Sequence, residues 1–191
     1  MKIYLIRHGQ TSANIKKIIP GAHAKLTKVG SKQAYAAARK LKNLPVDVVI
    51  TSPYERAKKT AAIIAKQLKK RLVVSNLLKE KKLPTEIEGK PSKSNNTEKI
   101  LDLLDKKNKK SPTWHYSDEE NFEDAKRRGL RFIKTIKKLK TDNVVVVSHK
   151  YFIKLLLFLI AKKMKNYRSF ARFYKSTAAS HGSVLACELV R

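Results

Sequence analysis

Short apolar runs alternate along the chain with longer stretches in which apolar residues recur at helical spacing. The apolar runs are rich in β-branched and aromatic residues, as buried strands are, and lie at residues 2–6, 46–51, 71–75, 143–147 and 183–190. The longer stretches predict helices at about residues 27–42, 52–69, 97–107, 117–139 and 151–161. Valines 144–147 form an unbroken apolar run, which is typical of a parallel strand covered on both faces. The pattern predicts an α/β fold.

Two of the predicted strands are followed by a histidine. Arg7, His8 and Gly9 come directly after the first strand, and Ser148 and His149 come after the fourth. Open α/β sheets bind ligands outside the carboxyl ends of their strands, so we expect both histidines at one edge of the sheet. Arg7 offers a planar fork that matches phosphate oxygens, and Gly9 allows the backbone to approach a ligand closely. This chemistry suits an anion.

The end of the second predicted strand carries another cation. Ser52 suits the N-cap of a helix, and Pro53 suits its first turn. Arg56 would then lie in the first turn of that helix, where free backbone N–H groups already favour an anion. A single arginine is more often an exposed surface residue, so this interpretation needs support from the sequence around it.

Composition limits the class of protein. The chain of 191 residues is long enough for one domain with a full core, and we expect a single domain over residues 1–191. One cysteine, Cys187, excludes an intramolecular disulfide and a cysteine-rich zinc site, and indicates a reducing, cytoplasmic compartment. The longest apolar stretch, residues 144–161, is interrupted by polar and basic residues, which argues against a membrane span.

The charge is strongly unbalanced, with 44 basic and 15 acidic residues and a formal net charge of +29. Such an excess attracts polyanions. The aromatic residues that alternate with bases near the C-terminus could bind a single-stranded nucleic acid by stacking: Tyr167, Phe170, Phe173 and Tyr174. Because the lysines are scattered over every predicted helix, we favour a solvated basic surface, with these aromatic residues packed into the fold.

Four motifs together resemble the histidine phosphatase superfamily, also called the phosphoglycerate mutase-like family. They are LIRHGQT at residues 5–11, LT-x-x-G-x-x-QA at 26–34, S-P-x-x-R-A-x-x-T-A at 52–61 and VVVVSHK at 144–150. The resemblance extends over nearly the whole chain. It implies a three-layer α/β/α sandwich with a mostly parallel central sheet, and it favours a functional interpretation of Arg56. The family usually has glycine where this chain has Lys150.

The resemblance also points to a general acid. In the family an L-x-E segment supplies it, and Leu78-Lys79-Glu80 matches that segment. Glu86, in the same predicted loop, is the alternative. A positioned carboxylic acid can protonate a leaving alkoxide and then take a proton from water.

Phosphoryl transfer through histidine needs a neutral imidazole and fixed cations around the transferring group. We assign the nucleophile to His8, oriented by Gly9. Arg7, Arg56 and, if it is protonated, His149 fit the role of the surrounding cations. The predicted phosphate-binding residues are Gly9, Gln10, Thr11, Asn14, Ser148 and Lys150. No metal or other cofactor is expected, because no clustered carboxylates or Cys/His ligand spacing appear.

The sequence therefore predicts a metal-independent phosphatase that hydrolyses a small phosphomonoester through a phosphohistidine on His8. One alternative is a phosphoglycerate mutase-type transfer, although the short middle region argues against the closed site that a mutase needs. Another is a nucleic-acid-binding protein on the same fold, which would use the basic C-terminal third. No membrane partner is expected. The surface charge could bind polyanions or nucleic acid non-specifically.

Overall fold

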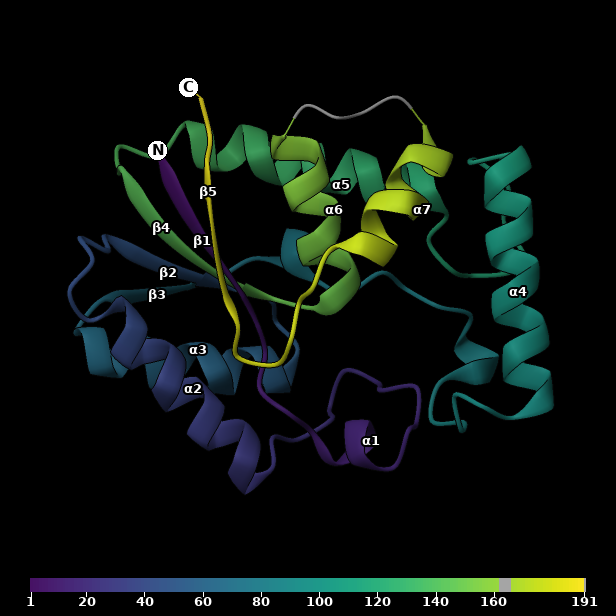
Figure 1. The fold of residues 1–191 in the computed structure, drawn as a ribbon, viewed down its shortest axis with the longest axis horizontal. Coiled ribbons are helices and arrows are strands. Elements are labelled where there is room, and N and C mark those ends of the chain that lie inside the picture. Colours follow the sequence, from purple (N-terminus) through teal and green to yellow (C-terminus); the bar gives the residue numbers. More distant parts are fainter. Residues whose placement is uncertain (162–165, 191) are drawn as a thin grey trace.

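A central β-sheet organises the structure, a computed structural model that describes residues 1–161 and 166–190. Within these residues the strands are β1 (Lys2–Arg7), β2 (Val48–Thr51), β3 (Arg71–Val74), β4 (Asn143–Ser148) and β5 (Val184–Glu188). Their order is β3-β2-β4-β1-β5. Only β5 runs antiparallel to its neighbour among these strands, so the predicted α/β fold with a mostly parallel sheet is confirmed (Figure 1).

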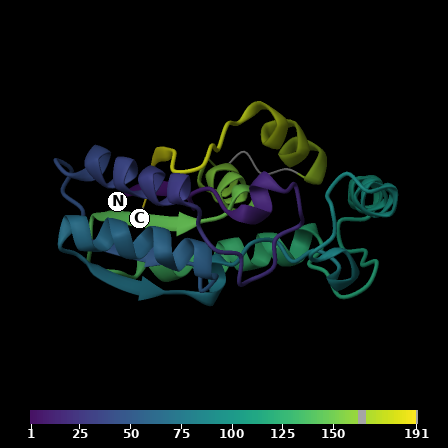
Figure 2. The same cartoon turned by 90° about the horizontal axis from the view of Figure 1, so that it is seen from below.

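Helices cover both faces of this sheet. They are α1 (Ser12–Ile15), α2 (Lys28–Leu41), α3 (Glu55–Leu68), α4 (Asn95–Lys110), α5 (Phe122–Lys137), α6 (Lys150–Ile160) and α7 (Tyr167–Ser176), with the 3₁₀ turns η1 (Asn76–Leu78) and η2 (Thr85–Ile87). Figure 2 shows α4 and α7 at the end of the molecule away from α2 and α3.

Alternation along the strands divides the core into two halves. In β1, Ile3 and Leu5 pack with α5 and α6, whereas Tyr4 and Ile6 pack with α2 and α3. The valines of β4 alternate in the same way between the two clusters. Successive strand side chains point to opposite faces, so an unbroken apolar strand must be covered on both sides. The three layers follow directly from this pattern.

Two helices begin later than the sequence predicts. α3 starts at Glu55, and the Ser52 hydroxyl accepts a hydrogen bond from the Tyr54 amide at 3.3 Å instead of capping the helix. α5 starts at Phe122, because Asn121 and Asp124 cap each other's backbone reciprocally in a capping box. Residues 117–120, expected in the first turn of α5, are a loop.

The aromatic residues of α7 belong largely to the core. Phe170 is only 1% exposed and packs against Phe122 and Phe158. Tyr167 donates a hydrogen bond from its hydroxyl to Asp105 at 2.8 Å. The packing interpretation is confirmed for Phe170, which cannot serve as a stacking surface for bases. No helix in the described part of the chain is long and apolar enough to cross a membrane.

Candidate active site

Parallel pairing of β1 with β4 brings the two strand-end histidines together. Arg7 lies opposite Ser148 in the register, and the His8 amide donates to the Ser148 carbonyl at 3.0 Å. The rings of His8 and His149 are 5.2 Å apart, and their side chains are almost completely buried. The predicted meeting of these histidines at one sheet edge is therefore present in the structure.

Both ring nitrogens of His8 are engaged. Nδ1 donates to the Gly9 carbonyl at 2.8 Å, and Nε2 accepts from Nε of Arg56 at 3.2 Å. Gly9 is itself confined, because a Cβ at this position would lie 2.2 Å from the Gly30 carbonyl oxygen. This close approach of two backbones explains the glycines in the RHG and LT-x-x-G motifs. The two hydrogen bonds of the ring fix the tautomer and orientation of His8.

The environment keeps the imidazole of His8 neutral. Burial lowers its pKa well below the ordinary value of 6.5, and the nearby Arg56 and Arg7 charges lower it further. The pKa of His149 is lowered well below 6.5 as well, first by burial and then by the charge of Arg56. Both effects favour the neutral ring of His149 in the protein without a ligand. Nε2 of His149 instead shares a hydrogen bond with the Ser52 hydroxyl at 2.8 Å.

Two arginines supply the fixed positive charge. Arg56 is 1% exposed and donates from Nη1 to the Gly21 carbonyl at 2.6 Å. Arg7 donates from Nη1 to the Ala179 carbonyl at 3.0 Å. Burial lowers the pKa of both arginines, and the negative charge of Glu80 opposes this shift. A guanidinium remains charged at neutral pH, so both residues are cations beside His8.

Three buried polar atoms around His8 have no hydrogen-bond partner: Nε of Arg7, Nδ1 of His149 and Nε2 of His181. Buried polar groups are nearly always hydrogen-bonded, and an unpaired one costs about 1–3 kcal/mol. A cluster of such atoms beside two arginines can accommodate the oxygens of an anion. The arrangement thus matches an oxyanion-binding site.

His181 was not among the predicted site residues. Its ring lies 5.7 Å from the ring of His8, and burial together with the charges of Arg7 and Lys150 lowers its pKa to about 4. The following residue holds it in place: the Gly182 amide donates to the Arg7 carbonyl at 3.0 Å, with a φ of +67° that favours glycine. A His-Gly pair before the last strand was the only signal in the sequence.

The carboxylate of Glu80 lies at the N-terminus of α6. It accepts hydrogen bonds from the amides of Tyr151 at 3.3 Å and Phe152 at 3.1 Å. Its charge acts on both arginines of the site, whereas Glu86 is exposed and hydrogen-bonds to the Tyr116 hydroxyl. The structure therefore favours Glu80 over Glu86 as the carboxyl group of the site.

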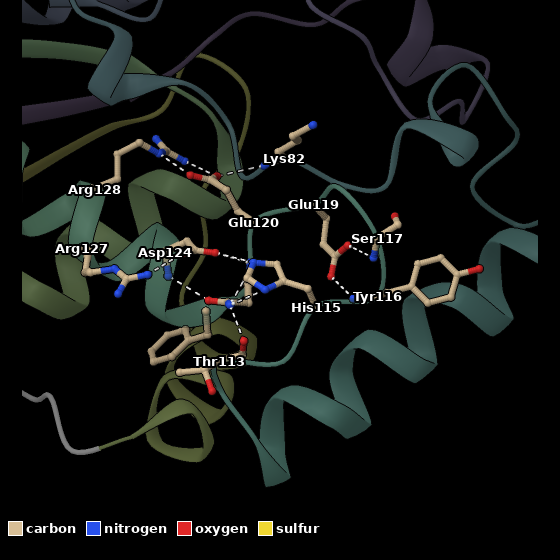
Figure 3. Close-up of polar contacts among 12 residues, drawn as sticks. Lys82, Thr113, His115, Tyr116, Ser117, Glu119, Glu120, Asp124, Arg127 and Arg128 are labelled. Carbon is tan, nitrogen blue, oxygen red and sulfur yellow. Dashed lines mark hydrogen bonds and ion pairs between the residues drawn. The ribbon is translucent and has the colours of Figure 1, made fainter.

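Arg128 of α5, which the sequence did not single out, holds the segment that carries Glu80. It donates to the carbonyls of Leu77 at 2.9 Å, Lys79 at 2.8 Å and Glu80 at 3.4 Å. Two further bonds join its guanidinium to the Glu120 carboxylate, at 2.7 and 2.6 Å, as Figure 3 shows. The planar guanidinium thereby connects α5 with the Glu80 segment.

The other predicted phosphate-binding residues mostly hold the backbone of the site. Gln10 accepts from the Thr27 hydroxyl at 3.1 Å. Thr11 and Asn14 form the capping box of α1. Ser148, at the end of β4, donates from its hydroxyl to the Leu78 carbonyl at 2.8 Å. Lys150 is the first residue of α6 and is exposed.

A cavity of about 160 Å³ opens on the Glu80 side of the site, lined among others by Gly21, Tyr54, Glu80 and Glu88. In the described residues, no group of three or more His, Cys, Asp or Glu side chains lies close enough to hold a metal ion. A ligand would therefore meet the guanidinium groups of Arg7 and Arg56 and the cavity beside Glu80.

Comparison with known proteins identifies the family. The histidine phosphatase superfamily (branch 1) matches residues 3–182. The chain belongs to the histidine phosphatase superfamily. A relative named "Putative phosphoserine phosphatase 2", from Hydrogenobacter thermophilus, is 33% identical over 153 residues, which are 78% of this chain and 72% of that protein. This histidine phosphatase is thus an enzyme of the phosphatase class.

Solved structures share the fold of this histidine phosphatase. The α-ribazole phosphatase from Shigella flexneri superposes with a TM-score of 0.81 at 22% identity, covering 100% of this chain and 92% of that chain. A mycobacterial glucosyl-3-phosphoglycerate phosphatase has a TM-score of 0.79 at 21% identity, covering 97% of this chain and 90% of that chain. These likenesses support the fold predicted from the four sequence motifs.

Proposed function

We propose that this histidine phosphatase hydrolyses a phosphomonoester by forming a phosphohistidine on Nε2 of His8, without a metal. The observation that carries the proposal is the state of His8: a buried, neutral imidazole with Nδ1 bonded to the Gly9 carbonyl. An Nδ1–H donor leaves the lone pair on Nε2, which faces Arg56. A neutral, oriented imidazole is the form that can attack phosphorus.

The phosphoryl group would lie against Arg7, Arg56 and the unpartnered ring nitrogens of His149 and His181. Charge on its equatorial oxygens is then balanced by groups that are already in place. A hydrogen bond to a charged group contributes about 1.5–3 kcal/mol. Loss of either arginine would consequently be severe.

Glu80 is proposed as the acid and base. In the first step the P–O bond to the leaving group breaks as the bond to Nε2 forms, and protonated Glu80 gives its proton to the leaving oxygen. In the second step Glu80 takes a proton from the water that attacks phosphorus, and Nε2 leaves. The relative that matches most of this chain and the two structural neighbours are named as phosphatases, which supports hydrolysis, whereas relatives that match only 66 residues are named as probable phosphoglycerate mutases.

The test is acid-labile labelling. Protein quenched during turnover of p-nitrophenyl phosphate in the presence of a chelator should carry one phosphate on His8, and chelator should not slow turnover. His8→Ala should lose both label and activity, whereas His23→Ala, which changes an exposed histidine, should keep both. Full turnover by His8→Ala would refute the nucleophile, and a strict requirement for a divalent metal would refute the metal-independent mechanism.

A further inference from the structure

Three adjoining hollows run from the Glu80 side of the site to the outer surface. The cavity of about 160 Å³ is lined by Glu80, Lys81 and Leu83. A second hollow of about 320 Å³ shares Lys81 and Leu83 with it. A third, of about 490 Å³, shares Asp105 and Lys175 with the second. Neighbouring hollows thus share lining residues, and we call the three together the trough; its outer hollow is lined by residues of α4 and α7, which lie on the right of Figure 1.

The chemistry of the walls changes along the trough. The second hollow is lined by Tyr151, Tyr167 and Tyr174 together with leucines. The third is lined by bases from two helices: Lys106, Lys109 and Lys110 of α4, and Arg168, Arg172 and Lys175 of α7. The spacing of these bases places each set on one face of its helix.

We call the third hollow the basic groove, and its acidic residue, Asp105, already has hydrogen-bond and ion-pair partners. Asp105 accepts from the Tyr167 hydroxyl and is paired with Lys109. It is the one acidic residue among those that line this groove in the described chain. The groove therefore presents a strong excess of positive charge, which attracts chains of phosphate groups.

The trough starts at the residue that faces the leaving group. If Glu80 protonates the leaving oxygen, as proposed above, the rest of the substrate extends from Glu80 past Lys81 and Tyr151. The Tyr151 amide donates directly to the Glu80 carboxylate, so the tyrosine-lined hollow adjoins the acid itself. A leaving group with an apolar part near the ester and anionic groups beyond it fits this order of surfaces.

We infer that the substrate is the terminal phosphomonoester of a polyanionic chain, with its further phosphate groups bound between α4 and α7. The inference rests on the proposed function, because it takes the direction of the leaving group from Glu80. A short oligonucleotide with a 5′-phosphate is an accessible member of this class. The tyrosines contact its first nucleoside, and the groove bases contact the phosphodiesters without reading sequence.

A control variant distinguishes the effect of the groove from the effect of the protein's net charge. Arg131, Lys134 and Lys138 line another basic hollow, on the outer side of α5, which shares no lining residue with the trough. Lys134→Glu with Lys138→Glu changes net charge by the same amount as Lys106→Glu with Arg172→Glu. All four side chains are exposed, so both double variants are expected to fold.

The experiment measures kcat/KM on 5′-phosphorylated oligothymidylates of one to four nucleotides and on p-nitrophenyl phosphate. For the wild type, kcat/KM should increase about fivefold or more from the shortest to the longest oligothymidylate at low salt. This increase should become smaller as the salt concentration rises. The Lys106→Glu/Arg172→Glu variant should lose this increase in kcat/KM. The slope of log kcat/KM against log salt concentration should become shallower by about two, one for each phosphate contact removed. The control variant should keep the gain, and neither variant should alter p-nitrophenyl phosphate turnover.

Three results would overturn the inference: no dependence on chain length in wild type, equal losses in the groove and control variants, or no turnover of the oligothymidylates. An enzyme that hydrolyses p-nitrophenyl phosphate while giving any of these results retains the proposed function. An enzyme that hydrolyses no phosphomonoester at all contradicts the proposed function itself. The two failures are therefore distinguishable.

Discussion

Arg128→Ala tests whether the site depends on one guanidinium outside it. This side chain is 14% exposed and the side chain of its partner Glu120 is 22% exposed. The guanidinium also lies 4.1 Å from the centre of the Phe152 ring. Its removal would leave Glu120 without its cation and would take a donor from the carbonyls of the Glu80 segment.

The expected loss of stability follows from these contacts. Breaking a fully buried ion pair by removing one partner costs about 3–5 kcal/mol, whereas exposed pairs contribute about 0–1 kcal/mol. The Arg128–Glu120 pair lies between these limits because both side chains retain some contact with water. With the lost carbonyl bonds, we expect the free energy of unfolding to fall by about 2–4 kcal/mol.

The neighbouring residue provides the control. Arg127 is also on α5 and pairs with Asp124, as Figure 3 shows. Its side chain is 70% exposed. Arg127→Ala should therefore change the free energy of unfolding by less than about 1 kcal/mol. Urea denaturation of the three proteins measures the difference.

Activity gives a second measurement. Arg128→Ala should lower kcat more for an alkyl phosphate, which needs a proton on its leaving group, than for an activated aryl phosphate. This follows because the bonds that are lost position the backbone of Glu80. Equal stability losses in the Arg127 and Arg128 variants, with unchanged kcat on both substrates, would refute the role assigned to Arg128.

Three further predictions concern the site. Glu80→Gln should reduce turnover of an alkyl phosphate far more than that of an aryl phosphate, by up to about 10²–10⁴-fold; equal losses would indicate a binding role. The pKa values of His8, His149 and His181 are all lowered in the folded protein, so below pH 6.5 the unfolded chain binds more protons than the folded one. Urea denaturation should therefore show the free energy of unfolding falling from pH 6.5 towards about pH 4. Equal stability at pH 7 and pH 5 would contradict this. His181→Ala should raise the inhibition constant of inorganic phosphate about 10-fold, whereas Ser180→Ala, with an exposed side chain on the same loop, should not; matching constants would exclude His181 from the site.

The fold could be predicted because its signals are local. The apolar run at 2–6 and the valines at 144–147 predict a sheet covered on both faces, and the amphipathic helices fall close to the predicted ranges. The start of α5 was misplaced because Ser117 and the acids at 118–120 looked like a first helical turn. The reciprocal hydrogen bonds of Asn121 and Asp124 set the start of α5. Several side chains within a few residues could cap a helix or favour its first turn, so the sequence pattern does not select one start.

Less of the candidate site could be predicted. His8, Arg56 and His149 follow strand ends and carry motifs, so their convergence was expected, although their roles remain to be tested. Arg128 and His181 lie on α5 and before β5, and only the packing of those elements brings them to the site. The sequence also left open whether His149 is protonated, because its pKa depends on burial and on the charge of Arg56.

The same cations that would bind phosphate also keep the histidines neutral. Arg56 donates to His8 and is the largest charge acting on the pKa of both His8 and His149, after burial. A protonated His8 could not accept that bond or attack phosphorus, so the arginine excludes the inactive form before any ligand arrives. Burial is the largest cause of the low pKa values of His149 and His181, and the neighbouring cations add to it. A bound dianion would oppose the effect of these cations on the pKa, while the effect of burial would remain.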